Sequence, residues 1–276
     1  MTTQYVPSSA EVVAFYDNAL PLIANLAGDN VHYGYWHSRE DTSTLHEAMD
    51  NLTDVMIERL GVTAGRRVLD VGCGLGAPAQ RLARARGVEV VGISTSPAMV
   101  REATARARAA GLGGQVRFEV ADAEHLPFED ASFDAAWAIE SLVHMADRPR
   151  VFREIGRVLR PGGRLALTDF YERIPFTGER LTMIEEYRRA ALNTPFHRLE
   201  EYPPMLRDAG LHLIEYLDIS EQTDRHYPML LERLRAHRDE LTAAYGAETV
   251  AALDSVFTNC ARTGEPHYML MTAYRS

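Results

Sequence analysis

The spacing of hydrophobic residues predicts a chain in which strands and helices alternate. Short hydrophobic runs indicate strands near residues 67–71, 88–93, 116–120, 133–138 and 163–169. Between them, hydrophobic residues recur at helical spacing near residues 77–86, 97–110 and 148–159. Strands separated by helices of this length are typical of a parallel, doubly wound α/β sheet.

Further helices are predicted on both sides of this alternating region. Residues 9–27 and 45–60 have helical spacing, and an aromatic segment at residues 31–36 lies between them. After residue 169 we expect helices near 178–192, 199–209, 226–243 and 247–260, and strands near 211–219 and 267–274. We therefore expect an N-terminal helical segment, residues 1–62, that completes the pocket. The core, residues 63–276, would carry helical cap insertions near 172–210 and 222–262.

The most informative segment is the turn after the first predicted strand, Asp70-Val71-Gly72-Cys73-Gly74-Leu75-Gly76. Glycine allows positive φ and lets a ligand approach the backbone closely. The start of the next helix offers free N–H groups and a positive dipole end, which suit a carboxylate or a phosphate. The turn alone does not identify the ligand, because its spacing also fits a loose form of the dinucleotide-binding fingerprint.

The end of the second predicted strand shows whether the turn belongs to a dinucleotide-binding site or to a site for another ligand. A dinucleotide site usually has an acidic residue there, which binds the ribose. Here the strand ends in Ser94-Thr95-Ser96, and the acid Asp70 ends the first strand instead. Three more segments follow in order: Asp122-Ala123 after the third strand, Ser132-Phe133-Asp134 before the fourth, and Pro161-Gly162-Gly163 before the fifth.

This ordered set resembles the class I S-adenosylmethionine-dependent methyltransferases, from about residue 31 to the C-terminus. The stretch Glu140-Ser141-Leu142-Val143-His144 is similar to the Glu-Ser-Leu-His-His stretch of the rebeccamycin sugar O-methyltransferases. Val143 replaces the first of the two histidines. The resemblance implies a Rossmann-like, mostly parallel seven-stranded sheet. It also implies S-adenosylmethionine (SAM) as cofactor, S-adenosylhomocysteine (SAH) as product, and a small-molecule acceptor in antibiotic or other natural-product biosynthesis.

The resemblance further implies which residues contact the cofactor. Asp70 and the glycine turn would meet its methionine part, and Asp122 with the Ala123 backbone would meet its adenine. Tyr33 would lie over the sulfonium, as a cation favours an aromatic face. Ser94 stands where the family usually has a ribose-binding acid. The full expected set is Tyr33, Asp70, Gly72, Cys73, Gly74, Ser94, Thr95, Met99, Asp122 and Ala123.

Three residues are candidates for catalysis. Methyl transfer requires a well-oriented nucleophile, and a hydroxyl nucleophile also requires a base. By resemblance, His144 and Asp169 match the family's acid–base pair: His144 titrates near neutral pH, and Asp169 would orient it or bind the acceptor. Glu140 would stabilise a carbocation if the methyl goes to carbon.

We favour O-methylation of a sugar or phenol hydroxyl with His144 as base. Three alternatives stay open at this point. The first is C-methylation of a prenyl, alkene or electron-rich carbon. The second is an NAD(P)-dependent oxidoreductase, and the third is a non-catalytic binding module.

Composition argues against several other kinds of function. The chain has no lysine, which excludes Schiff-base chemistry and the phosphate-binding loop of ATPases. A net charge of −10 argues against a nucleic-acid partner. Two cysteines, no signal-like start and no apolar run of membrane length predict a cytoplasmic protein without a membrane partner. The histidines lack metal-ligand spacing, so no metal is expected. The first predicted helix is apolar enough to pack on a second subunit, which leaves a homo-oligomer open.

Overall fold

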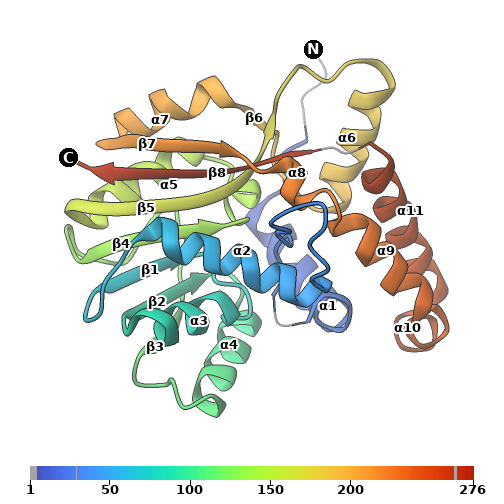
Figure 1. Cartoon of the computed structure of the whole chain (residues 1–276), viewed down its shortest axis with the longest axis horizontal. Helices are drawn as coiled ribbons and strands as arrows, with labels where there is room; N and C mark the ends of the chain where they lie inside the picture. Colours follow the sequence, from blue (N-terminus) through green and yellow to red (C-terminus); the bar gives the residue numbers. More distant parts are fainter. Residues whose placement is uncertain (1–4, 29, 264–265) are drawn as a thin grey trace.

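A mostly parallel sheet forms the centre of the computed structural model, which describes residues 5–28, 30–263 and 266–276 (Figure 1). Its strand order is β3-β2-β1-β4-β5-β8-β7, with the short β6 beside β5. β8 is antiparallel to both neighbours, whereas the pairs from β3 to β5 are parallel. The strands are β1 (Arg67–Val71), β2 (Glu89–Ser94), β3 (Val116–Val120), β4 (Phe133–Ile139), β5 (Leu159–Glu172), β6 (His197–Arg198), β7 (Leu211–Asp218) and β8 (His267–Arg275). The predicted doubly wound, Rossmann-like α/β fold is confirmed.

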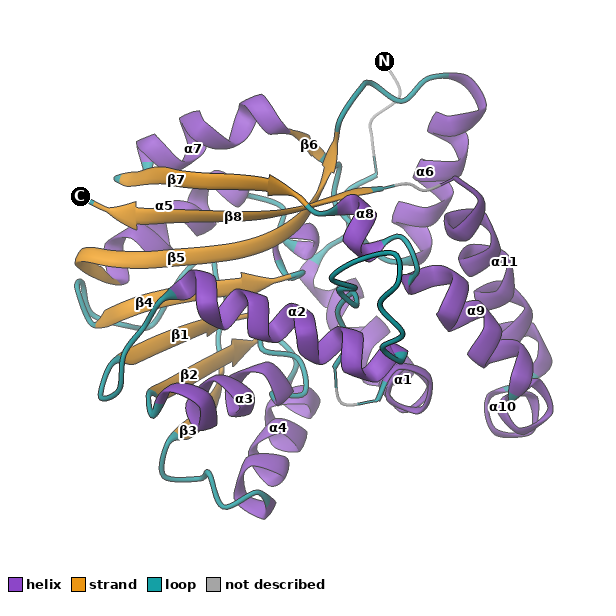
Figure 2. Ribbon diagram, in the orientation of Figure 1, coloured by secondary structure: helices purple, strands orange, loops and turns teal. Residues whose placement is uncertain are grey.

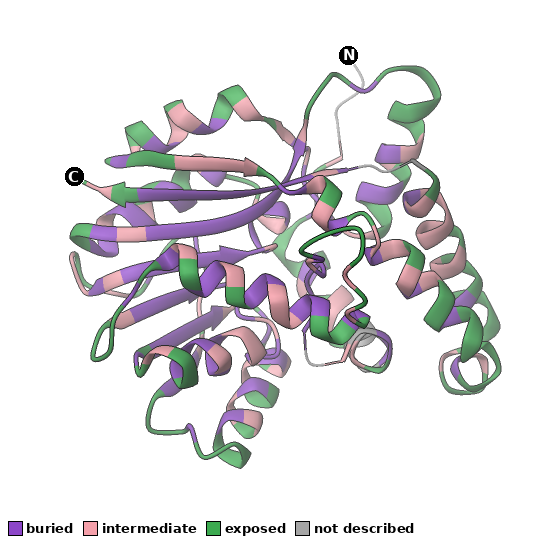
Figure 3. Ribbon diagram, viewed as in Figure 1, coloured by how far each residue is buried: buried purple, intermediate pink, exposed green. Residues whose placement is uncertain are grey.

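Helices cover both faces of the sheet (Figure 2). One face carries α2 (Leu45–Leu60), α3 (Ala77–Arg86) and α4 (Pro97–Ala109), and the other carries α5 (Arg148–Val158) and α7 (Tyr202–Asp208). Successive side chains of a strand point to opposite faces, so Val68 and Leu69 belong to two separate core clusters. Because both faces are covered, the central strands are buried along most of their length (Figure 3).

The remaining helices lie at the carboxyl ends of the parallel strands, on the right of Figure 1. They are α1 (Ser9–Ala27), α6 (Gly178–Ala190), α8 (Ser220–Thr223), α9 (His226–Ala236), α10 (Arg238–Tyr245) and α11 (Ala247–Thr263). Leu22 and Leu26 of α1 share a hydrophobic cluster with Leu230 and Leu234 of α9, so the N-terminal helix packs against the cap. Of the helices described, none has the length and apolar character needed to cross a membrane. Residues 1–4 and 29 of the expected N-terminal segment lie outside the described residues.

Two predicted elements differ from the structure. The helix expected at 226–243 is divided into α9 and α10, because His237 leaves helical geometry at ψ 20°. The strand expected at 163–169 runs from Leu159 to Glu172, since Leu159 pairs with β4 and Tyr171 pairs with β6. The extension of β5 at each end could not be predicted from local sequence, because it depends on pairing with β4 at one end and with β6 at the other. The sequence also did not predict β6, α8 and the 3-10 turn η1 (Leu142–His144).

Candidate active site

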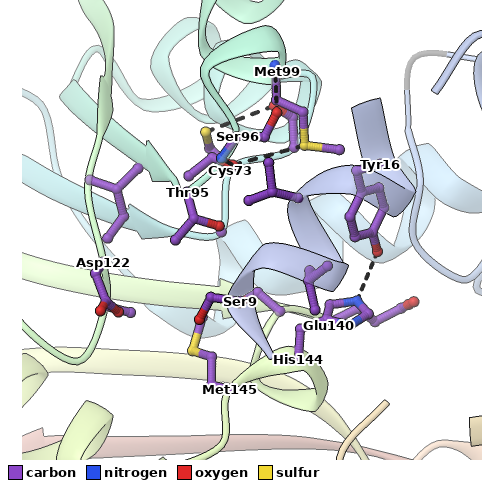
Figure 4. Close-up of a pocket in the computed structure, with 18 of the residues that line it drawn as sticks. Ser9, Tyr16, Cys73, Thr95, Ser96, Met99, Asp122, Glu140, His144 and Met145 are labelled. Atoms are coloured by element: carbon purple, nitrogen blue, oxygen red, sulfur yellow. Dashed lines mark hydrogen bonds between the residues drawn. The ribbon is translucent and has the colours of Figure 1, made fainter. Parts of the chain in front are cut away.

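A cavity of about 330 Å³ lies at the carboxyl ends of the strands, beside the point between β1 and β4 where the strand order reverses. Open α/β sheets bind their ligands at this point. Its walls are the segments that follow β1, β2, β3 and β4, and α1 covers it (Figure 4). Nine of the ten expected cofactor residues line it: Asp70, Gly72, Cys73, Gly74, Ser94, Thr95, Met99, Asp122 and Ala123.

The turn after β1 presents backbone to the cavity. Gly72 has a φ of +81°, and a Cβ there would stand 2.2 Å from the Cβ of Ser141. The N–H groups of Gly72 and Cys73 both donate to the Ile93 carbonyl, at 3.0 and 2.9 Å. The turn is therefore packed against the segment after β4 and hydrogen-bonded to β2, and these contacts require glycine at position 72.

Asp70 is a buried carboxyl at the end of β1, and one of its two oxygens lacks a hydrogen-bond partner. The residue is 3% exposed, and its Oδ2 accepts no hydrogen bond from the described residues. Burial raises the pKa of this carboxyl to about 7, against a smaller lowering by the Trp137 indole. A buried acceptor that faces a cavity is suited to a cationic or N–H-bearing ligand. The ammonium group of SAM meets this requirement, so the residues present fit the expected cofactor.

The segment after β2 carries hydroxyls in place of an acid. Ser94 Oγ accepts from the Ser96 N–H at 3.1 Å and lies 3.9 Å from the Met99 sulfur. Ser96 caps α4 and donates to Asp17 Oδ1 of α1 at 2.5 Å. This bond ties the start of α4 to the N-terminal helix, a contact between distant segments that sequence analysis missed.

The segment after β3 forms the opposite end of the cavity. Asp122 Oδ1 accepts from the Glu124 N–H at 2.9 Å, while the neighbouring Ala123 is buried. This bond holds the Asp122 side chain in a turn beside the cavity, where the expected adenine contacts would be made. Within the described part of the chain, no three His, Cys, Asp or Glu side chains are placed to hold a metal ion.

His144 lines the cavity with both ring nitrogens hydrogen-bonded. Its Nδ1 lies 3.0 Å from the Leu192 carbonyl oxygen, and its Nε2 lies 2.8 Å from the Tyr16 hydroxyl. Since a carbonyl only accepts, this network assigns the proton to Nδ1 and leaves Nε2 as the acceptor from Tyr16. Burial lowers the pKa of His144 to about 4, so the ring is neutral at pH 7. Burial also raises the pKa of Tyr16, which stays a phenol.

The loop that carries His144 is fixed by a segment of the cap, residues 192–195. The Thr194 N–H donates to the Val143 carbonyl at 2.6 Å. The buried Arg148 donates from Nε to the Leu142 carbonyl at 3.1 Å and from Nη1 to the Pro195 carbonyl at 3.5 Å. These bonds hold the imidazole in one position relative to the cavity.

Glu140 lines the cavity directly after β4. It is a non-glycine residue with a φ of +50°, an uncommon backbone conformation that clusters at functional sites. Its Oε1 accepts from the Tyr33 N–H and from the Tyr268 hydroxyl, both at 2.5 Å. Burial raises the pKa of Glu140 to about 8, against lowering by these two hydrogen bonds.

Asp169 lies outside the cavity, and the expected His144–Asp169 pair is not formed. Thr168 faces Glu140, to whose N–H its hydroxyl is bonded at 3.2 Å, so the next side chain along β5 points to the opposite face. There Asp169 accepts from the Tyr202 hydroxyl at 2.7 Å and lies 3.6 Å from Arg148 Nη2. In this structure Asp169 is the buried counter-ion of Arg148, and it reaches His144 only through the loop that Arg148 holds.

Tyr33 also lies outside the residues that line the cavity. Its ring stacks between His226 and Tyr268, with centroid distances of 4.3 and 4.9 Å. The expectation that this ring lies over the sulfonium is therefore corrected, because the stack holds it in the core. Tyr33 contributes its backbone N–H, through the bond to Glu140.

The N-terminal helix, part of the segment expected to complete the pocket, supplies one wall of the cavity. Val12, Val13 and Tyr16 of α1 line the cavity, together with Val31 and His32. Tyr16 and His144 are 128 positions apart in the sequence. An amphipathic helix pattern does not show what it covers, so the sequence did not decide which residues of this helix face the cavity.

Comparison with known proteins agrees with this geometry. A methyltransferase-domain model matches residues 69–167. The chain is 40% identical to Methyltransferase GfsG of Streptomyces halstedii, over 98% of this chain and 96% of that protein. It is 42% identical to 27-O-demethylrifamycin SV methyltransferase of Amycolatopsis mediterranei, over 85% of each. It is also similar to the crystal structure of the [4+2]-cyclase SpnF, with a TM-score of 0.85 and 34% identity, over 99% of this chain and 98% of that chain. The similarities to GfsG and SpnF cover 98% and 99% of this chain, so they extend beyond the sheet to α1 and the cap.

Proposed function

The chain belongs to the SAM-dependent methyltransferases, and from this premise we propose that it methylates a hydroxyl oxygen of a small natural product with His144 as general base. The cofactor, when bound, supplies an electrophilic methyl group. Asp70 and the glycine turn would hold its amino-acid end, and Asp122 with Ala123 its adenine end. Family membership removes the nicotinamide oxidoreductase from the alternatives.

The observation that carries this proposal is the hydrogen bond between Tyr16 and His144. The Nε2 atom of the neutral imidazole already accepts a hydrogen bond from a hydroxyl on the covering helix. An acceptor hydroxyl in the place of the Tyr16 hydroxyl would be bonded in the same way. When the acceptor oxygen takes the methyl group, the methyl–sulfur bond would break and SAH would leave. Nε2 would then hold the oxygen's proton, and the Leu192 carbonyl would stabilise the imidazolium through Nδ1.

The cavity wall near His144 favours an acceptor with a hydrophobic skeleton. Val12, Val13, Ile139 and Met145 line this part of the cavity. Such side chains bind apolar surface, while a few polar groups set orientation. The relative named for 27-O-demethylrifamycin SV supports a hydroxyl as the methylated group. An alcohol or phenol on an apolar framework, with or without an attached sugar, fits this wall.

The test uses SAM with a deuterated methyl group and a panel of macrocyclic alcohols, phenols, glycosides and prenylated aromatics. Mass spectrometry detects the transfer, and carbon NMR locates the label. We expect the label on oxygen. A label on carbon would instead support C-methylation, with Glu140 beside a developing cation, and would remove the need for His144 as base.

A second candidate function is ring formation without methyl transfer. It is favoured by the 34% identity to a cyclase over nearly the whole of both chains. The same panel, extended to linear polyenes, separates the two candidates. A cyclised, unlabelled product made in the presence of SAM or SAH would support the cyclase and contradict methylation.

The pH dependence of the rate follows from the burial of His144. The neutral imidazole is the active form, and burial lowers its pKa from near 6.5 to about 4. At saturating SAM, we therefore expect kcat/KM for the acceptor to be lost only as pH falls through about 4. Rates measured from pH 5 to 8 should show no loss centred near 6.5. A loss centred there would mean that the base is solvent-exposed or is another group.

A further inference from the structure

The cavity is lined by acidic side chains and by no arginine among its described residues. Asp70, Asp122, Glu124 and Glu140 all contribute to the wall, whereas none of the 29 arginines does. His32 and His144 also line it, and burial lowers the pKa of both, so they bring no positive charge at pH 7. Carboxyl groups are thus the charged groups that this wall can offer a ligand, and they favour a cationic one.

The two buried carboxyls of this wall stand at different places. Asp70 ends β1, and Glu140 follows β4, the neighbouring strand. Ser141 occupies the space that a side chain at Gly72 would need, and its hydroxyl donates to the Val71 carbonyl at 2.5 Å. Glu140 therefore adjoins the glycine turn on the side of His144. The glycine turn, Glu140 and His144 all line the same cavity.

Among the described residues, no cation contributes to the pKa shift of Glu140. Both of its hydrogen bonds go to Oε1, which leaves Oε2 available to a ligand. Asp169, across β5, acts to raise its pKa, as does burial, while Tyr268 and the Tyr33 N–H act to lower it. Tyr16 and Tyr187 each have a pKa raised in part by Glu140, and both stay neutral. The pKa of the Tyr33 phenol is likewise raised in part by Glu140, and the neutral His144 lines the same cavity.

We propose that Glu140 is the residue that makes this cavity bind SAM in preference to SAH. The two molecules share their ammonium, carboxylate, ribose and adenine groups, and differ only in the methyl group and the positive charge on sulfur. Asp70, at the amino-acid end, meets a group that both possess. Glu140, between the turn and His144, would meet the sulfonium, which only SAM possesses. This inference rests on SAM as cofactor and does not depend on the acceptor or on His144 as base.

The proposal predicts that SAM binding is linked to one more proton than SAH binding. With a pKa of about 8, Glu140 is mostly protonated at pH 7, and a neighbouring sulfonium favours its ionised form. Binding of SAM then releases a proton, so its affinity falls as pH falls below 8. Asp70, with a pKa of about 7, also titrates, but its effect on SAM and SAH is the same and cancels in their ratio. We expect the ratio of Kd for SAH to Kd for SAM to fall by up to about tenfold per pH unit between pH 8 and 6.

The experiment is calorimetric titration of the cofactor-free full chain with SAM and with SAH at pH 6, 7 and 8. Two buffers of different ionisation enthalpy count the protons released. Glu140→Gln should weaken SAM about tenfold at pH 8, change SAH by no more than about twofold, and abolish the proton release specific to SAM. Asp70→Asn is the matched control, which should weaken both ligands equally and leave their ratio unchanged.

Two results would overturn the proposal. One is a ratio of the two dissociation constants that stays constant with pH in the wild-type protein, a measurement that needs no variant to fold. The other is a Glu140→Gln protein that keeps the wild-type thermal midpoint and loses affinity for SAM and SAH equally, or for neither. His144→Ala should keep the wild-type ratio, so a failure of the proposed base is distinguishable from a failure of the proposed charge recognition.

Discussion

Replacement of His144 by alanine is expected to lower kcat for methyl transfer by about 10²–10⁴-fold, the range that a positioned general base contributes. The reason is that Nε2 is the neutral acceptor in the cavity wall that already binds a hydroxyl. The Kd of SAH should change by no more than about twofold, because the expected cofactor contacts come from the segments after β1, β2 and β3. Single-turnover rates with labelled SAM, together with SAH titrations, provide the measurement.

Tyr16→Phe is the matched control for this variant. It removes only the hydroxyl that now occupies Nε2 and keeps the ring that packs edge-on against His144. If the acceptor hydroxyl takes that place during the reaction, the rate should change by less than about tenfold, the effect of one neutral hydrogen bond. A His144→Ala protein with a near wild-type rate would contradict the role of His144 as base.

Replacement of Asp169 by alanine is expected to lower the free energy of unfolding by about 3–5 kcal/mol, the usual effect of removing one partner of a buried ion pair. Asp169 and Arg148 are both almost completely buried, so the arginine would be left without its counter-ion in the core. Urea unfolding, followed by circular dichroism, measures the loss. Because Arg148 holds the loop that carries His144, we also expect the folded variant to have a lower kcat.

Tyr202→Phe provides the comparison for Asp169. It removes one hydroxyl that donates to Asp169 and leaves the ion pair, so the loss should be smaller, about 1–2 kcal/mol. An Asp169→Ala protein with wild-type stability but no activity would contradict this purely structural role. It would instead support the role that the sequence indicated for Asp169, in direct contact with the reacting groups.

Sequence alone determined the fold class and brought nine of the ten expected cofactor residues to one cavity. The strand, the acid Asp70 and the glycine turn are adjacent in the chain, and each following wall segment begins where a predicted strand ends. In a parallel sheet, the carboxyl ends of neighbouring strands meet at one edge. Residues such as Ser94 and Asp122 could therefore be placed in one cavity from their positions in the chain, before any distance was known.

Tertiary structure decided which catalytic candidates face that cavity. Asp169 and Thr168 are neighbours on a fully buried strand, and the hydrophobic pattern of such a strand does not show which face each side chain takes. Tyr33 was expected over the cofactor from its aromatic character, but its stacking partners are far away in the sequence. The bond between Tyr16 and His144 joins helix α1 to the loop after β4 across 128 positions. Local residue patterns record what a segment forms and how it is buried, whereas contacts between distant segments depend on how the helices pack over the end of the sheet.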